Sequence, residues 1–347
     1  MIYVVRKQLK PIFFALLAAI FYAINVPFSK QLLQDVPPTF MASFLYFGAG
    51  IGVGTLYLFH WKNEKPEERL KKENFPYTIG MILLDIFAPI FLMFGISIGS
   101  SANASLLSNF EIVATTLIAL LLFKENVSRR LWTAIGFITI SSIILSFEGS
   151  GSFHFSLGSL FVLLATICWG MENNCTRKIS DKSIYQIVTI KGLCCGTGSF
   201  IVAFVTGESL PHSKYILLAT LLGFIAYGLS IFLYIRAQRD LGAAKTSAYY
   251  SVAPFVGTFL AFIINGEALS IAYLIGLFFM IIGTIFVVSD TLVKNHSHLH
   301  THLITHTHDG STHTHTITHE HSHDHFLSTN VHTHHHAHAI LKENQHL

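Results

Sequence analysis

Four ionisable residues, Asp85, Glu111, Glu172 and Lys191, lie inside long apolar stretches of the sequence. An ionisable side chain in hydrocarbon costs about 3 kcal/mol, so it usually faces other protein groups or a water-filled cavity. Carboxylates in that setting exchange protons or bind cations. Because three acids stand against one lysine, the set favours a cationic substrate or proton coupling over an anionic substrate. The alternative is structural: Glu172 and Lys191 pair only to neutralise each other.

Candidate metal ligands fill residues 291–347, which hold all but three of the 21 histidines. They alternate with Thr, Ser, Asp and Glu, and neutral imidazole suits zinc, nickel, cobalt and copper. Closely spaced ligands cost little loop-closure entropy. We predict that this tail binds such a metal in the cytoplasm, as a buffer or regulator, although the protein requires no cofactor. The alternating candidates are His296, His298, His300, His302, His319, His321, His323, His325, His332, His334, His336 and His338.

The same tail has too little apolar surface to offset chain entropy, so we expect it to be disordered without metal. Two other interpretations stay open: a sensor of protonation, since histidines gain charge below about pH 6.5, and inert low-complexity sequence. An expression tag does not fit, because the segment is long and irregular and contains no run of six histidines.

The elements that must position the charged residues are transmembrane helices. Hydrophobic residues make up 52% of the 347 residues and charged residues only 12%, and a spanning helix needs about 20 apolar residues. The apolar runs show no strand alternation, which excludes a barrel. The net charge of +3 gives no patch for nucleic acid. The candidate spans are 11–33, 38–61, 75–99, 102–123, 130–148, 157–177, 184–206, 214–236, 243–264 and 268–289.

The orientation of these ten spans follows from Lys and Arg, which concentrate on the cytoplasmic side of membranes. With a cytoplasmic N-terminus, all but three of the 22 basic residues fall in cytoplasmic segments. The exceptions are Lys30, Lys191 and Lys214. We therefore expect a multi-pass protein of the cell membrane, surrounded by lipid, with both termini in the cytoplasm. The oligomeric state stays open, with a homodimer as one arrangement.

The chain also contains an internal repeat. LLAAIFYAINVPFSK (16–30) aligns without gaps with LLATICWGMENNCTR (163–177), and residues 105–128 align with 247–270. This divides the chain into five-helix repeats, 11–148 and 157–289, followed by the tail, 291–347. Because five is odd, the second copy must enter the membrane inverted, and such repeats bind substrate near their interface. Asn25 aligns with Glu172, so we predict that the two are related by an approximate two-fold axis.

From this arrangement we predict one central cavity. Asn25, Asp85, Glu111, Glu172 and Lys191 line it, with Tyr22 and Trp169 as aromatic walls. Glu111 is our main candidate for proton or cation coupling, because it lies in the middle of its span.

Residues 234–276 carry a family resemblance. Small residues open the ninth span, Pro254 lies within it, and Gly266-Glu267 ends it; Lys124-Glu125 takes the corresponding place in the first copy. This plan resembles the EamA-type members of the drug/metabolite transporter superfamily, over residues 10–290. The resemblance implies two inverted five-helix repeats and secondary transport of small metabolites, often outward. It does not extend to Glu111-Ile112, where the first copy often has a proline, or to the tail.

The leading interpretation is therefore a secondary transporter, in the exporting direction, of small metabolites or drugs. No HExxH, GxSxG or Rossmann glycine motif occurs, so we expect no enzymatic activity. Two alternatives remain: a transporter of divalent transition metals, and a membrane metal sensor that transports nothing.

Overall fold

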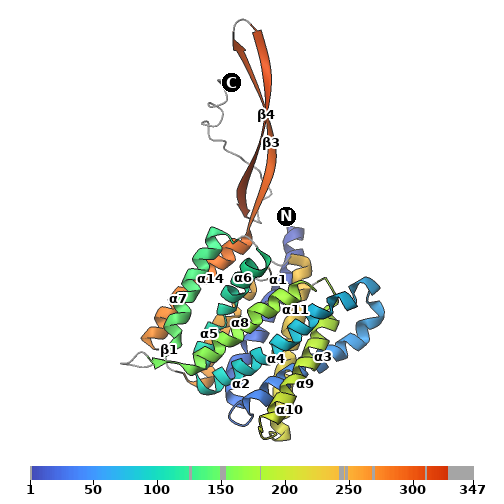
Figure 1. Ribbon diagram of the computed structural model, residues 1–347, viewed down its shortest axis with the longest axis vertical. Coiled ribbons are helices and arrows are strands. Elements are labelled where there is room, and N and C mark those ends of the chain that lie inside the picture. The colour runs from blue at the N-terminus through green and yellow to red at the C-terminus, as the bar shows by residue number, and fades with distance from the viewer. Residues whose placement is uncertain are drawn as a thin grey trace. The chain divides into compact units, whose positions relative to one another are not determined.

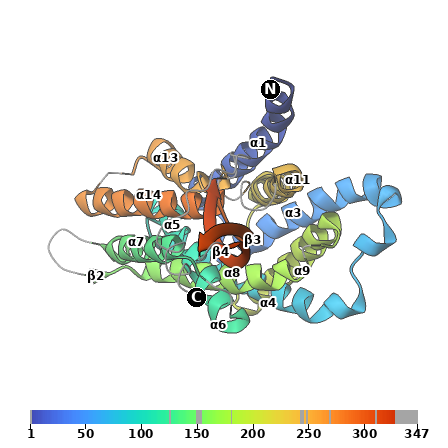
Figure 2. The same cartoon turned by 90° about the horizontal axis from the view of Figure 1, so that it is seen from above.

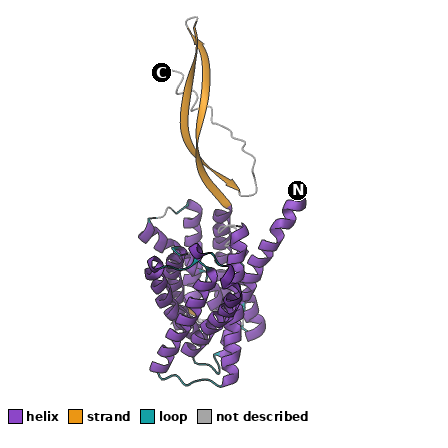
Figure 3. Ribbon diagram, turned by 90° about the vertical axis from the view of Figure 1, so that its right-hand side faces the viewer, coloured by secondary structure: helices purple, strands orange, loops and turns teal. Residues whose placement is uncertain are grey.

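The computed structural model describes residues 2–124, 127–148, 154–179, 181–241, 246, 249–267, 270–308 and 311–326 (Figure 1). The chain divides into two units, residues 1–289 and 290–347. The first is a bundle of helices, and the second contains a pair of strands (Figure 3).

The first half of the bundle ends in a short strand. Its helices are α1 (Ile2–Ala23), α2 (Asn25–Leu32), α3 (Pro38–His60), α4 (Phe75–Ile98), α5 (Ser101–Leu107), α6 (Phe110–Phe123) and α7 (Arg129–Ser146). Three 3-10 turns connect α3 to α4: η1 (Trp61–Asn63), η2 (Pro66–Glu68) and η3 (Lys72–Asn74). After α7, β1 (Phe147–Glu148) pairs antiparallel with β2 (His154–Phe155).

The second half repeats this plan. Its helices are α8 (Leu157–Arg177), α9 (Ile184–Val205), α10 (Ser213–Gly223), the π-helical turn η4 (Phe224–Leu229), α11 (Ser230–Leu241), α13 (Ala253–Asn265) and α14 (Ile271–Leu292). In both halves the third-span helix packs on the first-span helices of the other half: α4 lies on α8, and α11 lies on α1.

The helices identify a multi-pass membrane protein. Within the described residues, seven helical segments are long and apolar enough to cross a membrane. The remaining expected spans also form helices. However, α7 is short and starts with two arginines, α8 carries five polar or charged residues near its end, and α13 has only 13 residues. The expected count of ten spans is thus not confirmed by length and composition.

Four of the spans are interrupted near their middles. A turn at Ile24 separates α1 from α2, and Pro27, which has no amide hydrogen, follows it. A second turn, at residues 108–109, separates α5 from α6 without any proline. The π-helical η4 interrupts the eighth span, and a turn at residues 251–252 precedes α13. By contrast, Pro89 lies inside an uninterrupted α4. Such breaks are tolerated at membrane depth where the backbone lines a cavity or is buried in protein.

Equivalent helices of the two halves touch each other at two places. At the first, α3 crosses α9 where a Cβ on Gly192 would come within 2.3 Å of the Gly50 Cα atom, so only glycine fits. At the second, α7 lies beside α14, with the Ser141 hydroxyl donating to the Gly276 carbonyl and the Phe137 and Phe279 rings stacked (Figure 2). Two elements related by a two-fold axis can touch only where that axis passes between them. The packing therefore fits the two-repeat architecture.

The tail differs from the expectation of disorder. β3 (Val293–His308) and β4 (Ser311–Phe326) form an antiparallel hairpin (Figure 3). The expectation of disorder is thus not confirmed for these residues; it considered apolar content alone. The same residues alternate His with β-branched Thr at period two, which is the repeat of a strand. Residues 309–310 and 327–347 lie outside the described part of the chain.

Candidate functional site

Lys191 on α9 lies between two carboxylates of other helices. Its ammonium nitrogen is 2.7 Å from an Asp85 oxygen on α4 and 3.0 Å from a Glu172 oxygen on α8. Asp85 and Glu172 are almost fully buried. Away from the acids, small residues let α4 and α8 approach closely: a Cβ on Gly158 would lie 2.8 Å from the Cα atom of Gly99, the residue after α4. The Glu172–Lys191 pair is thus present, and Asp85 makes it a three-residue ion cluster.

Glu111 lies next to this cluster, with a different kind of partner. It occupies the first turn of α6, directly after the break at residues 108–109. The Asn173 amide donates to Glu111 at 2.6 Å and to the Thr115 hydroxyl at 3.3 Å. Asn173 follows Glu172 on α8, so the polar end of α8 contacts both the ion cluster and Glu111. A neutral amide can serve either the ionised or the protonated carboxyl group.

Asn25 is fully buried where α2 begins. Its amide donates to the Tyr227 hydroxyl at 3.4 Å, and its carbonyl accepts from the Ser29 hydroxyl at 3.1 Å. Glu172 makes the matching contact four residues along α8, where the Thr176 hydroxyl donates to its carboxylate. Ser29 and Thr176 are themselves aligned in the repeat. The two aligned positions therefore share one local arrangement, although only one of them is charged.

Tyrosines lie between Asn25 and the ion cluster of Asp85, Glu172 and Lys191. Tyr227, in η4, lies 5.3 Å between ring centroids from Tyr46 and 6.2 Å from Tyr22. Tyr46 also lies next to Asp85, and Tyr22 packs on Tyr250 at 6.0 Å. Buried Tyr rings supply an apolar body and a hydroxyl that needs a partner. The π-helical turn carries Tyr227, and such turns often mark functional sites.

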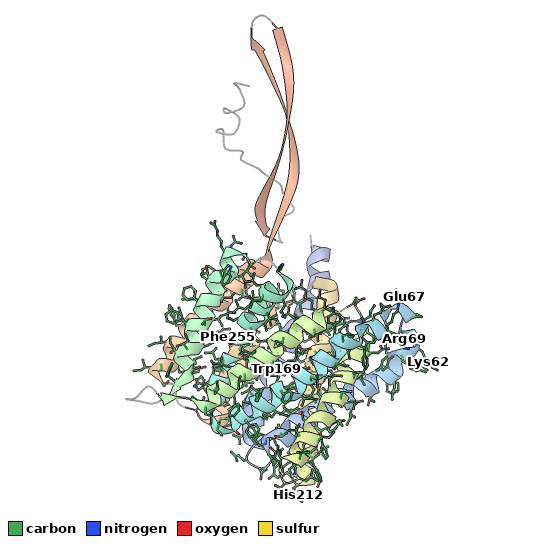
Figure 4. All side chains as sticks on the ribbon, in the orientation of Figure 1. Lys62, Glu67, Arg69, Trp169, His212 and Phe255 are labelled. Atoms are coloured by element: carbon green, nitrogen blue, oxygen red, sulfur yellow. The ribbon has the colours of Figure 1, made fainter. Side chains whose placement is uncertain are left out.

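The structure thus brings most of the sequence-predicted residues together. Asp85, Glu172 and Lys191 form one cluster, Glu111 joins it through Asn173, and Asn25 and Tyr22 join it through tyrosines. Trp169 is buried in the apolar core on α8, inside the bundle (Figure 4). Sequence reasoning missed Asn173, Thr115, Tyr46, Tyr227 and Tyr250. Their residue types could have indicated that they belong to the site, since amides and hydroxyls inside apolar spans also need hydrogen-bond partners.

Two further charged groups cap helix ends rather than join this site. The Lys30 ammonium donates to the carbonyls of Ile96 and Gly99 at the end of α4, at 2.7 and 2.8 Å. The Glu267 carboxylate accepts from the backbone amides of Ser101 and Ala102 at the start of α5. Partial burial raises the pKa of Glu267, but hydrogen bonds to Ser100 and Ser101 outweigh it and leave that pKa below its usual range.

The tail candidates fall in two groups. His296, His298, His300 and His302 lie on β3, and His319, His321, His323 and His325 lie on β4. His332, His334, His336 and His338 lie outside the described residues. Among the side chains that the structure places, no group of three or more His, Cys, Asp or Glu residues could hold a metal ion.

Comparison with known proteins agrees with this architecture. The model of the EamA-like transporter family matches residues 9–147 and again residues 156–289. An uncharacterized transporter of Methanothermobacter thermautotrophicus is 24% identical over 278 residues, 73% of this chain and 79% of its own. The uncharacterized transporter YyaM of Bacillus subtilis is 23% identical, over 69% of this chain and 81% of its own. One from Clostridium kluyveri is 26% identical, over 78% and 91%.

The fold has a solved counterpart. One crystal structure superposes with a TM-score of 0.60, covering 81% of this chain and 96% of its own at 16% identity, which concerns the fold alone. The two family matches coincide with the two halves of the bundle described above. Together they cover most of the chain, so this protein belongs to the EamA-like transporter family.

Proposed function

We propose that the protein is a secondary transporter that moves small cationic metabolites or drugs out of the cell, with proton coupling at Glu111. The observation that carries the proposal is the charge balance of the buried cluster. Three carboxylates gather around one ammonium group, and that ammonium bonds directly to only two of them, Asp85 and Glu172. Glu111 is held by a neutral amide instead.

This difference assigns separate roles to the carboxylates. Asp85 and Glu172 share the single ammonium of Lys191, which offsets one of their two negative charges when both are ionised, and breaking that pairing in a buried setting is costly. Glu111 has no such direct partner among the described residues, so a proton or a substrate cation is the natural neutralising group. The site therefore takes up one positive charge at Glu111, either as a proton or as part of the substrate.

The position of the whole site, which includes the ion cluster and its polar neighbours, supports alternating access. Its residues come from both repeats, and three of them lie at helix interruptions: Asn25, Glu111 and Tyr227. Transporters built from repeats bind their substrates at such interrupted helices near the repeat interface. We propose that ten helices cross the cell membrane, with α7, α8 and α13 completing the seven longer ones. Both termini are then cytoplasmic, as the basic residues indicate.

Proteoliposome transport tests the proposal. Purified protein is reconstituted with a pH-sensitive dye inside the vesicles, and amines, amino acids and cationic drugs are added in turn. We expect one class to move protons with wild-type protein, and Glu111→Gln to reduce coupled flux about tenfold or more, since a lost contact with a charged group costs about 1.5–3 kcal/mol. The exposed Glu73→Gln is the matched control.

Two outcomes would decide against the proposal. Wild-type flux and wild-type pH dependence in Glu111→Gln would remove Glu111 from the mechanism. Zinc or nickel flux in the same vesicles, without flux of organic cations, would favour the metal-transport alternative. If nothing moves while metal binds, the protein is a sensor.

A further inference from the structure

The histidines of β3 and β4 lie on one face of the hairpin. Within β3 and β4 the chain has twelve histidines, at even-numbered positions in β3 and at odd-numbered positions in β4. The register pairs even with odd positions, for example His298 with His321. Residues two apart share a face of a strand, and directly opposed residues share it across the pair. All twelve therefore occupy the same face.

Four rungs of the hairpin are histidine on both strands. They are His296–His323, His298–His321, His300–His319 and His306–His313. The first three are consecutive on that face. The opposite face holds Thr, Ser, Leu and acidic residues, and Thr301–Thr318 is one of its rungs.

This register changes which histidines are nearest neighbours. Along one strand, residues two apart are separated by about 6.6 Å. Across an antiparallel pair, opposed Cβ atoms lie only about 5 Å apart. Two imidazoles at the shorter separation can both reach one metal at the Zn–N distance of about 2.0–2.1 Å. The cross-strand rung, rather than the His-x-His run along the chain, is thus the closest ligand pair.

We propose that the hairpin is a row of metal sites in which each His–His rung supplies two imidazole ligands to a divalent transition metal such as zinc or nickel. Adjacent rungs complete the tetrahedral set that zinc prefers. The connecting residues are Asp309-Gly310, the pair that two-residue hairpin turns favour. This inference does not rest on the transport function, because it concerns only the tail and is read out by metal binding.

The decisive variant keeps every histidine but moves half of them to the other face. It exchanges each β4 histidine with the residue before it: His313 with Thr312, His315 with Thr314, His319 with Thr318, His321 with Glu320, His323 with Ser322, and His325 with Asp324. Composition and His-x-His spacing largely survive, while the cross-strand rungs are lost. The full-length protein is used, with the six histidines after Phe326 replaced by Asn in both forms.

Zinc affinity is measured in detergent by competition with a chromophoric chelator. We expect the unexchanged protein to bind several zinc ions, and the exchanged protein to bind roughly tenfold or more weakly, because each ion then finds ligands within one strand only. Equal affinity and stoichiometry in the two forms would overturn the proposal, since spacing along the chain would then suffice. Absence of saturable binding in the unexchanged form would overturn it as well.

A cross-link tests the register separately. Leu303 and Thr316 are opposed on the other face and are untouched by the exchange. In a background with the four native cysteines replaced by Ser, Leu303→Cys with Thr316→Cys should form a disulfide readily when diamide is added as the oxidant without zinc, because zinc binds thiolates. Leu303→Cys with Ser322→Cys, at a distant register position, is the control. Equal cross-linking of the two pairs would show that the register, and with it the row of sites, is wrong.

Discussion

Asn25 and Glu172 occupy aligned positions in the two repeats, yet their chemistry differs. Each is buried, and each contacts a hydroxyl four residues along its own segment, on Ser29 or Thr176. Asn25 also donates a hydrogen bond to the neutral hydroxyl of Tyr227, whereas Glu172 forms an ion pair with the ammonium of Lys191. The fold supplies the same position twice, and the sequence uses one copy for hydrogen bonding and the other for charge.

Two repeats of similar backbone can thus differ in the charge that they place at the site. The ionisable groups of the site, Asp85, Glu111, Glu172 and Lys191, lie on α4, α6, α8 and α9, while the Asn25 side holds tyrosines. On the transport proposal, a cation entering between the repeats would meet a charged wall, formed by Asp85, Glu111, Glu172 and Lys191, and a neutral aromatic wall, formed by Asn25 and the tyrosines around it. Aromatic faces also attract cations, at about 0.5–2 kcal/mol.

The largest effect should come from Lys191, the only cation of the charged wall among the described residues. Lys191→Met leaves the Asp85 and Glu172 carboxylates buried side by side without their counter-ion. We expect a loss of about 3–5 kcal/mol in the free energy of unfolding, as for other broken buried ion pairs. Thermal unfolding in detergent measures it.

A neutral version of the cluster is the control for that loss. Adding Asp85→Asn and Glu172→Gln to Lys191→Met should recover most of the stability, because no buried charge is then unpaired. If Lys191→Met alone is as stable as the wild type, the ion cluster does not hold the charged wall together.

Substitutions at the two aligned positions compare the walls directly. Glu172→Gln should reduce substrate flux in proteoliposomes about tenfold, since hydrogen bonds to charged groups are worth about 1.5–3 kcal/mol. Asn25→Ala should reduce it only about twofold to fivefold, because its bonds are neutral. Equal losses at the two positions would mean that charge is not what distinguishes the repeats.

The smallest effect should appear at Glu267, which joins the repeats by capping α5. Its lowered pKa means that it contributes stability above the usual carboxyl range and loses that contribution as pH falls through the lowered value, so the relevant window lies below about pH 4.5. Glu267→Gln should cost about 1 kcal/mol at pH 7, as for a lost helix cap. The deficit should shrink on acidification.

Thermal unfolding of Glu267→Gln and wild type from pH 7 to pH 3.5 measures this difference. Glu73→Gln, an exposed loop substitution, is the control and should show no deficit at either pH. A deficit in Glu267→Gln that stays constant over the whole range would exclude an ionised cap.

Most of the fold was predictable from the sequence, for physical reasons. The apolar runs placed the helices closely: α8 was expected at 157–177 and is observed there, and α4 begins at the expected residue 75. Hydropathy could not show the break at residues 108–109, because no proline marks it and Ser and Asn are tolerated in helices. It also could not reveal the β-hairpin, whose strand signal is alternation rather than apolarity.

The candidate site was predictable in part. An ionisable residue is rare inside an apolar run and is therefore easy to recognise, which is why Asp85, Glu111, Glu172 and Lys191 were identified. The alignment identified Asn25. The sequence suggested the Glu172–Lys191 pair but not the other partners. That Asp85 also bonds Lys191, and that Glu111 bonds the Asn173 amide, depends on how the helices are rotated against each other. Tyr227 and Tyr250 carry no distinguishing pattern until the helices are packed.

The crossing of α3 and α9 has a consequence for assembly. The glycines there admit no side chain because backbone atoms of the partner helix, which belongs to the other repeat, lie too close; at Gly283 of α14 a Cβ would lie 2.7 Å from the Ile138 side chain of α7. Either repeat alone would leave these close-packed glycine faces without their partner helix, and would separate Asp85 from Glu172 and Lys191. The two repeats therefore depend on each other for their packing, and neither can form these contacts alone.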